Sequence, residues 1–117
     1  MIIDTHCHLD DKSFDNDLSQ VIENAVNNGV EGVLIPGADI NDLPKAAIIV
    51  RKFKNVFFAA GVHPYEKAGF DEETLRKFAQ DEKCIAVGEC GLDYFRLPKD
   101  ENEKELEKAE QKRVFRA

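Results

Sequence analysis

The sequence predicts an α/β fold built from four consecutive strand–helix units. Short apolar runs alternate with amphipathic stretches along the whole chain, and Gly, Pro and Asn residues separate them. Parallel strands require crossover connections, usually helices, and these crossovers are right-handed. With 117 residues and 43% hydrophobic content, residues 1–117 are expected to form a single domain with a parallel sheet covered by helices.

The first two units show this pattern most clearly. An apolar strand is expected at residues 1–6, and "GVLIPG" at residues 32–37 predicts a second strand that ends at Pro and Gly. Asn28 and Gly29 end the intervening helix, whose apolar residues recur at helical spacing: Phe14, Leu18, Val21, Ile22, Ala25 and Val26. The stretch "NDLPKAAIIVRKF" predicts a second helix with these residues facing inward: Leu43, Ala46, Ala47, Val50 and Phe53.

The last two units are shorter or less apolar. "NVFFAAGVHP" predicts a third strand, and Asp71 is expected to cap the next helix, with an apolar stripe at Leu75, Phe78 and Ala79. "CIAVGECGLD" predicts the fourth strand. Residues 100–117 predict a charged helix to which we assign no function, because its apolar stripe is thin: Leu106, Ala109, Val114 and Ala117.

Two architectures accommodate four such units. One is a small open doubly wound sheet, and the other is part of a closed eight-stranded TIM-type (β/α)8 barrel of about 250 residues, whose mean unit is about 31 residues. The spacing of the units here is close to that value, so the chain would supply roughly half of a barrel.

Composition and charge narrow the possible functions. A net charge of -7 is unlike that of proteins that coat nucleic acid, but an enzyme acting on phosphates remains compatible, because a bound divalent cation supplies local positive charge. No apolar run has the length of about 20 residues that a membrane span needs, and no signal peptide is visible, so we expect no membrane partner and a cytoplasmic location. The three cysteines are expected to be reduced.

The stretch "DTHCHLD" suggests a metal site at the end of the first strand. Side chains alternate along a strand, so His6 and His8 should share one face while Cys7 points away. Two neutral imidazoles on one face form a good chelate for a divalent cation. A surface or hydrogen-bonding role for the pair is the alternative. Parity places Cys7 and Cys90 on the helix side, which argues against a thiolate site.

Further polar residues fall at the ends of later strands, where α/β folds place their sites. Glu89 lies in an apolar strand pattern, and a buried carboxylate is costly without a cation or hydrogen-bond donors, so we predict that it is a ligand. His63 follows the third strand and could instead be a hydrogen-bonding turn residue. Asp93 and Asp4 could orient a ligand residue or cap a loop.

Three motifs together, "DTHCHLD", "GVHPYE" and "VGECGLDYF", resemble the TatD-type metal-dependent deoxyribonucleases of the amidohydrolase-like barrel superfamily. The resemblance implies a TIM-type barrel with one or two divalent metal ions that hydrolyses phosphodiester bonds in DNA, as a 3'-5' exonuclease. By position it implies that His6, His8 and Glu89 hold metal, that Glu89 is catalytic, and that His63 and Asp93 lie near the substrate. Imidazole and carboxylate ligands suit Zn, Mg, Mn or Ni alike.

The chain departs from the family pattern in two ways. Tyr65 stands where the family commonly has a second histidine, and Cys90 where it has an apolar residue. Family members also run to about twice this length and place two further histidines and an aspartate on later barrel strands. We therefore expect an incomplete site in this chain alone, and either a missing barrel half or self-association to cover the open sheet.

Two other functions remain open from the sequence. One is a different hydrolase of the same superfamily, acting on a cyclic amide or a phosphotriester, although no lysine is evident at a strand end to serve as a ligand. The other is a non-catalytic, truncated interaction module, which the absent later ligands would favour.

Overall fold

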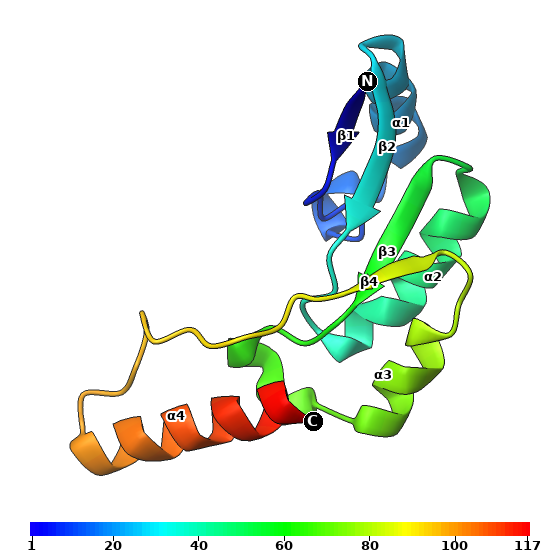
Figure 1. Ribbon diagram of the computed structural model, residues 1–117. Coiled ribbons are helices and arrows are strands. Elements are labelled where there is room, and N and C mark those ends of the chain that lie inside the picture. Colours follow the sequence, from blue (N-terminus) through cyan, green and yellow to red (C-terminus); the bar gives the residue numbers. More distant parts are fainter.

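The computed structural model describes residues 1–117 and confirms the α/β prediction (Figure 1). Four strands pair in parallel and in chain order: β1 (Ile2–Asp4), β2 (Val30–Ile35), β3 (Val56–Ala60) and β4 (Cys84–Val87). The helices that follow them are α1 (Leu18–Asn27), α2 (Leu43–Lys52), α3 (Glu72–Ala79) and α4 (Glu101–Arg116). In each of the first three units a short 3-10 helix lies between the strand and the α-helix: η1 (Lys12–Phe14), η2 (Ile40–Asp42) and η3 (Pro64–Gly69). These are four consecutive βα units.

The hydrophobic core lies between the sheet and the helices on one of its faces. Phe58 and Val56 of β3 are fully buried, as are Ile35 of β2 and Val50 of α2. The prediction for α2 is confirmed at four of its five positions: Leu43, Ala46, Ala47 and Val50. The fifth, Phe53, follows the helix in an extended conformation and is only half-buried.

The predictions for α1 and α3 are correct in part. Phe14 lies in η1 and not in α1, and Val26 points to solvent with 49% of its surface exposed, so the apolar face of α1 is narrower than its sequence indicates. In α3, Asp71 is the N-cap as predicted, because its side chain accepts a hydrogen bond from the Thr74 backbone N–H. Ala79 is exposed and adds nothing to the apolar stripe.

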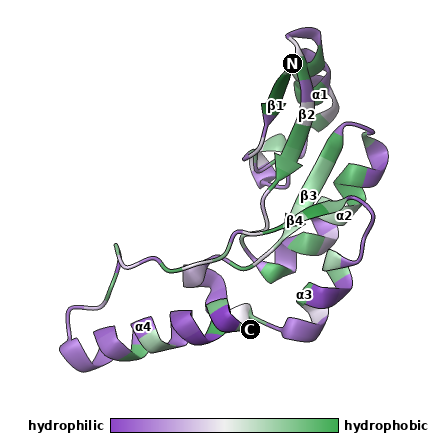
Figure 2. Ribbon diagram, in the orientation of Figure 1, coloured by the Kyte–Doolittle hydropathy of each residue, from purple (hydrophilic) through white to green (hydrophobic).

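The other face of the sheet carries no helix. Ile3 on β1 and Ile85 on β4 are 56% and 58% exposed, and with Phe57 of β3 they line an apolar groove of about 290 Å³. β3 and β4 are apolar strands, as the colouring in Figure 2 shows, and most of β4 is exposed to solvent. β1 and β4 are also the two unpaired edges of the sheet. This is the geometry expected of an open half of a barrel.

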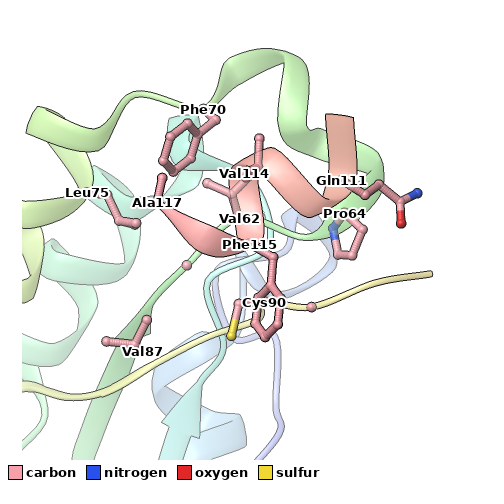
Figure 3. Close-up of a pocket in the computed structure, with 12 residues that line it drawn as sticks. Val62, Pro64, Phe70, Leu75, Val87, Cys90, Gln111, Val114, Phe115 and Ala117 are labelled. Carbon is pink, nitrogen blue, oxygen red and sulfur yellow. The ribbon is translucent and has the colours of Figure 1, made fainter. Parts of the chain in front are cut away.

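Helix α4 lies apart from the sheet, beyond the carboxyl ends of the strands, and contacts η3 (Figure 1). Its one buried residue is Gln111, at 1% exposure, and Leu106 of the predicted stripe is exposed. Val114 and Phe115 border an apolar cavity of about 240 Å³ together with Val62 and Phe70 (Figure 3). None of the helices combines the length and the apolar composition that crossing a bilayer requires.

Candidate metal centre

The two histidines of "DTHCHLD" lie beyond β1, which ends at Asp4. Strand alternation therefore does not orient them directly. Cys7 packs against the core and Leu9 is buried within it, and the Cys7 N–H donates to the carbonyl of Leu34 at 3.1 Å. Because the intervening residues point inward, His6 and His8 both point outward, and their ring centroids lie 5.1 Å apart. His6 and His8 therefore lie on the same side of the chain, as predicted, but the burial of Cys7 and Leu9 orients them and not membership of a strand.

Glu89 lies two residues beyond the end of β4, held by the loop that follows β2. The Gly37 N–H donates to the Gly88 carbonyl at 3.0 Å, and the Glu89 N–H donates to the Gly37 carbonyl at 2.6 Å. Gly61, beyond β3, packs so closely that a Cβ there would collide with the Gly88 carbonyl group. Close backbone approach of three loops therefore fixes the position from which Glu89 extends. Its side chain is 28% exposed and not enclosed in a strand, which corrects the expectation of a buried strand residue.

The three predicted ligands converge. His6 Nε2 lies 3.6 Å from Glu89 Oε1, and His8 Nε2 lies 4.0 Å from Glu89 Oε2. One donor atom from each residue falls within 4.8 Å of the other two. These separations exceed hydrogen-bond length, yet 3.6 and 4.0 Å are shorter than twice the metal–ligand distance of about 2.1 Å. The donor set of two imidazoles and a carboxylate therefore fits a divalent cation.

The cysteines near this cluster do not join it. Burial, together with the nearby carboxylates of Asp4 and Asp10, raises the pKa of the Cys7 thiol, so the thiolate needed for metal binding is disfavoured. Cys90 is exposed beside the cavity next to α4, where the prediction of a small buried hydrophobe is wrong (Figure 3). All three cysteines are free.

His63 and Asp93 form a separate pair at the carboxyl ends of β3 and β4. His63 is the N-cap of η3, where its Nδ1 accepts a hydrogen bond from the Tyr65 N–H at 3.2 Å. Its Nε2 is thereby left facing Asp93 Oδ2 at 3.9 Å. The Tyr65 ring stacks on His63, and its hydroxyl accepts a hydrogen bond from the Arg96 N–H. Tyr65 thus supports the loop that carries Asp93.

Asp10 is a further polar residue of this region, and its place in the sequence does not single it out. Its side chain is 8% exposed, its Oδ1 has no hydrogen-bond partner, and it lies 4.0 Å from His8 Nδ1. Burial raises the pKa of the Asp10 carboxyl above its ordinary value. Asp4, considered as an orienting residue, accepts a hydrogen bond from the His6 backbone N–H at 3.0 Å, so it shapes the turn and not the imidazole.

The fold and this cluster define a class: a barrel-type α/β protein with a candidate metal centre at the carboxyl ends of its strands. The chain belongs to the TatD-related DNase family, whose model matches residues 3–117. The family resemblance noted in the sequence is therefore confirmed.

Individual relatives agree with this assignment. The metal-dependent hydrolase YabD of Bacillus subtilis is 35% identical over 105 residues, which are 86% of this chain and 41% of the relative. The 3'-5' ssDNA/RNA exonuclease TatD of Escherichia coli K12 is 31% identical over 98 residues, covering 81% of this chain and 38% of the relative. The chain thus spans about two fifths of the length of these curated relatives.

The fold has a match among solved structures. The crystal structure of YjjV, a TatD homologue from Escherichia coli K12, superposes with a TM-score of 0.74 at 26% identity. The superposition covers 97% of this chain and 46% of that protein. This coverage agrees with the predicted half of a barrel.

Proposed function

We propose that residues 1–117 form the N-terminal half of a metal-dependent nuclease barrel that hydrolyses phosphodiester bonds in DNA from the 3' end. The observation that carries the proposal is the convergence of His6, His8 and Glu89 on one point at the carboxyl ends of the strands. Membership of the TatD-related DNase family supports it, as do the names of the relatives, which include both a metal-dependent hydrolase and an exonuclease.

In this proposal the three residues hold one or two divalent ions, of which Zn, Mg, Mn and Ni all suit the donor set. A bound divalent cation supplies polarisation of a phosphoryl oxygen and lowers the pKa of a coordinated water. Glu89 is the catalytic residue, because its two oxygens face different histidines and can fix the arrangement from both sides. Backbone hydrogen bonds with Gly37 fix the position of the Glu89 backbone from which that carboxylate extends.

His63 and Asp93 are proposed to contact the DNA substrate. The backbone N–H of Tyr65 occupies Nδ1 of His63, so only Nε2 can donate to a phosphate oxygen. Asp93 Oδ2 lies 3.9 Å from this Nε2, beyond hydrogen-bond length, so both groups are free to contact the substrate.

The bare sheet face is proposed to receive the other half of the barrel, with self-association as the substitute when the chain is alone. The groove bordered by Ile3 and Ile85 is apolar, and both outer strands have unpaired backbone groups. Further βα units of the same fold would satisfy both features at once, and they would also supply the additional ligands that the family resemblance implies.

The direct test measures metal content and nuclease activity together. Purified chain is titrated with Zn²⁺ and Mn²⁺ by calorimetry, and its activity on single-stranded DNA labelled at the 3' or the 5' end is followed with and without the C-terminal half of YabD. We expect saturable metal binding and loss of the 3' label first. The double variant His6→Ala, His8→Ala and the variant Glu89→Gln should lose both properties, whereas Glu82→Gln, at an exposed glutamate on the α3–β4 turn, should lose neither.

Two outcomes would contradict the proposal. Absence of both metal binding and activity would leave the interaction-module hypothesis. Metal binding without DNA cleavage, but with hydrolysis of a cyclic amide or a phosphotriester, would favour a different hydrolase of the same superfamily. The name of YabD, a metal-dependent hydrolase, specifies no substrate and is compatible with that activity too.

A further inference from the structure

One carboxylate oxygen of Asp10, Oδ1, is buried without a hydrogen-bond partner in the fold. This oxygen is inaccessible to solvent and accepts no hydrogen bond, and the Asp10 side chain as a whole is 8% exposed. Burying an unpaired carboxylate oxygen is costly, so it calls for a compensating interaction or a functional reason.

The basic groups around Asp10 are already engaged elsewhere, with one exception, and Asp42 adds only a like charge. Lys45 forms its ion pair with Asp15, not with Asp10. The neighbouring acid Asp11 is exposed and caps η1 by accepting hydrogen bonds from the N–H and hydroxyl of Ser13. The exception is His8, whose Nδ1 lies 4.0 Å from the unpaired Oδ1 of Asp10.

The His8 imidazole therefore lies between two carboxylates. Nδ1 faces Asp10 at 4.0 Å, and Nε2 faces Glu89 at 4.0 Å, on the side of the candidate metal centre. A neutral imidazole carries a proton on one nitrogen only, and a hydrogen bond at one nitrogen decides which nitrogen is free to bind metal. Asp10 borders a pocket of about 320 Å³ with His8 and Asp42, so its side chain has room to turn toward Nδ1.

We propose that Asp10 is a positioning residue for His8: its carboxylate accepts the Nδ1–H hydrogen bond when a cation binds, which keeps Nε2 unprotonated and directed at the metal centre. The inference rests on the proposed function only as far as metal binding by His6, His8 and Glu89. It does not depend on the identity of the substrate. Outer hydrogen-bond partners of this kind typically change metal affinity by about 10–100-fold.

The test uses Zn²⁺ as the probe on the 117-residue chain labelled with 15N-histidine. In the zinc-loaded wild type, we expect the 15N signals of His8 to show a protonated Nδ1, with a slowly exchanging proton, and a metal-bound Nε2. Asp10→Ala should lose the slow exchange and bind Zn²⁺ about 10–100-fold more weakly. Asp10→Asn, which keeps an acceptor oxygen, should recover part of the affinity.

Stability of the metal-free chain separates a positioning role from a structural one. Asp10→Ala removes an unpaired buried charge, so the metal-free variant should unfold at the same or a higher urea concentration than the wild type while binding zinc more weakly. Asp11→Ala, which removes an equal charge from the adjacent exposed position, should leave zinc affinity unchanged. A structural role would instead lower stability and leave the affinity of the folded fraction unaltered.

The outcomes distinguish this inference from the proposed function. Wild-type zinc binding with unchanged affinity and unchanged Nδ1–H exchange in Asp10→Ala would overturn the role of Asp10 and leave the metal centre standing. Absence of zinc binding by the wild type would overturn both. Equal losses in Asp10→Ala and Asp11→Ala would assign the effect to net charge and overturn the hydrogen bond.

Discussion

The side-chain amide of Gln111 hydrogen-bonds both backbone groups of Asp93. The Asp93 N–H donates to Oε1 at 2.8 Å, and Nε2 donates to the Asp93 carbonyl at 2.9 Å. The same Nε2 also donates to Glu107 Oε1 at 2.9 Å. One buried residue thus attaches α4 to the loop that follows Glu89 and carries Asp93. This attachment gives a role in the fold to a helix whose sequence indicates only a solvated charged surface.

Gln111→Leu removes both hydrogen bonds to Asp93 at nearly constant volume. Two backbone groups then lose their partner in a partly buried position, and we expect the free energy of unfolding to fall by about 2 kcal/mol. Urea denaturation monitored by circular dichroism measures the change. Gln80→Leu, at the exposed end of α3, is the matched control and should change the stability by less than about 0.5 kcal/mol. Equal losses in the two variants would show that Gln111 does not anchor α4.

The ion pair between Lys67 and Glu107 predicts a pH dependence for the same attachment. The hydrogen bonds from Lys67 and then from Gln111 hold the pKa of Glu107 below its ordinary value. A lowered pKa means that the folded state favours the ionised carboxylate. The contribution is therefore fully present above the ordinary carboxyl pKa and is lost as the pH falls through the lowered one.

Glu107→Gln tests this dependence. The variant should be less stable than the wild type near pH 7, and the difference should shrink as the pH falls below about 4. Denaturation curves at a series of pH values provide the measurement. Glu103→Gln, at an exposed position of α4 that takes no part in the ion pairs of that helix, is the control for a change in net charge. A stability difference that stays constant down to pH 3 would be inconsistent with the assigned role.

The periodicity of the sequence predicted the order and type of every major element, because burial on one sheet face imposes a regular pattern on strands and helices. It also selected His6, His8 and Glu89, which the structure brings together. Asp10 and Asp11 are indistinguishable in the sequence, yet the side chain of Asp10 is 8% exposed whereas Asp11 lies open to solvent. Such differences arise from contacts between distant segments and leave no local pattern.

Gly61 should be intolerant of any side chain. Alanine there would force its Cβ into the backbone of Gly88, so the loop that carries Glu89 has to move. We expect Gly61→Ala to lower the free energy of unfolding by about 1–3 kcal/mol and to weaken metal binding. Calorimetric zinc titration and urea denaturation measure the two effects. Gly32→Ala places its methyl group 3.7 Å from Ile3, at ordinary contact distance, and should have neither effect.

The two histidine sites should differ in their effect on metal binding. His6→Ala removes a donor atom of the candidate metal centre. Loss of a residue that only hydrogen-bonds a metal ligand typically weakens metal binding by about 10–100-fold, so zinc affinity should fall by at least as much in His6→Ala. His63 pairs with Asp93 and is not in that cluster, so His63→Ala should bind zinc as the wild type does. If nuclease activity is reconstituted, His63→Ala should raise KM for DNA. Equal loss of zinc affinity in both variants would refute the division into a metal centre and a substrate contact.

The bare sheet face predicts the behaviour of the isolated chain in solution. Ile3 and Ile85 place apolar surface along an open groove between two unpaired strand edges, and burying that surface in a second copy is favourable. Light scattering at increasing concentration should therefore show dimers or larger species. Ile85→Lys puts a charge in the groove and should shift the population toward monomer. Ile48→Lys changes an isoleucine of similar exposure on α2, outside the groove, and should leave the association unchanged. A monodisperse wild-type monomer at every concentration would overturn the proposed self-association through this face.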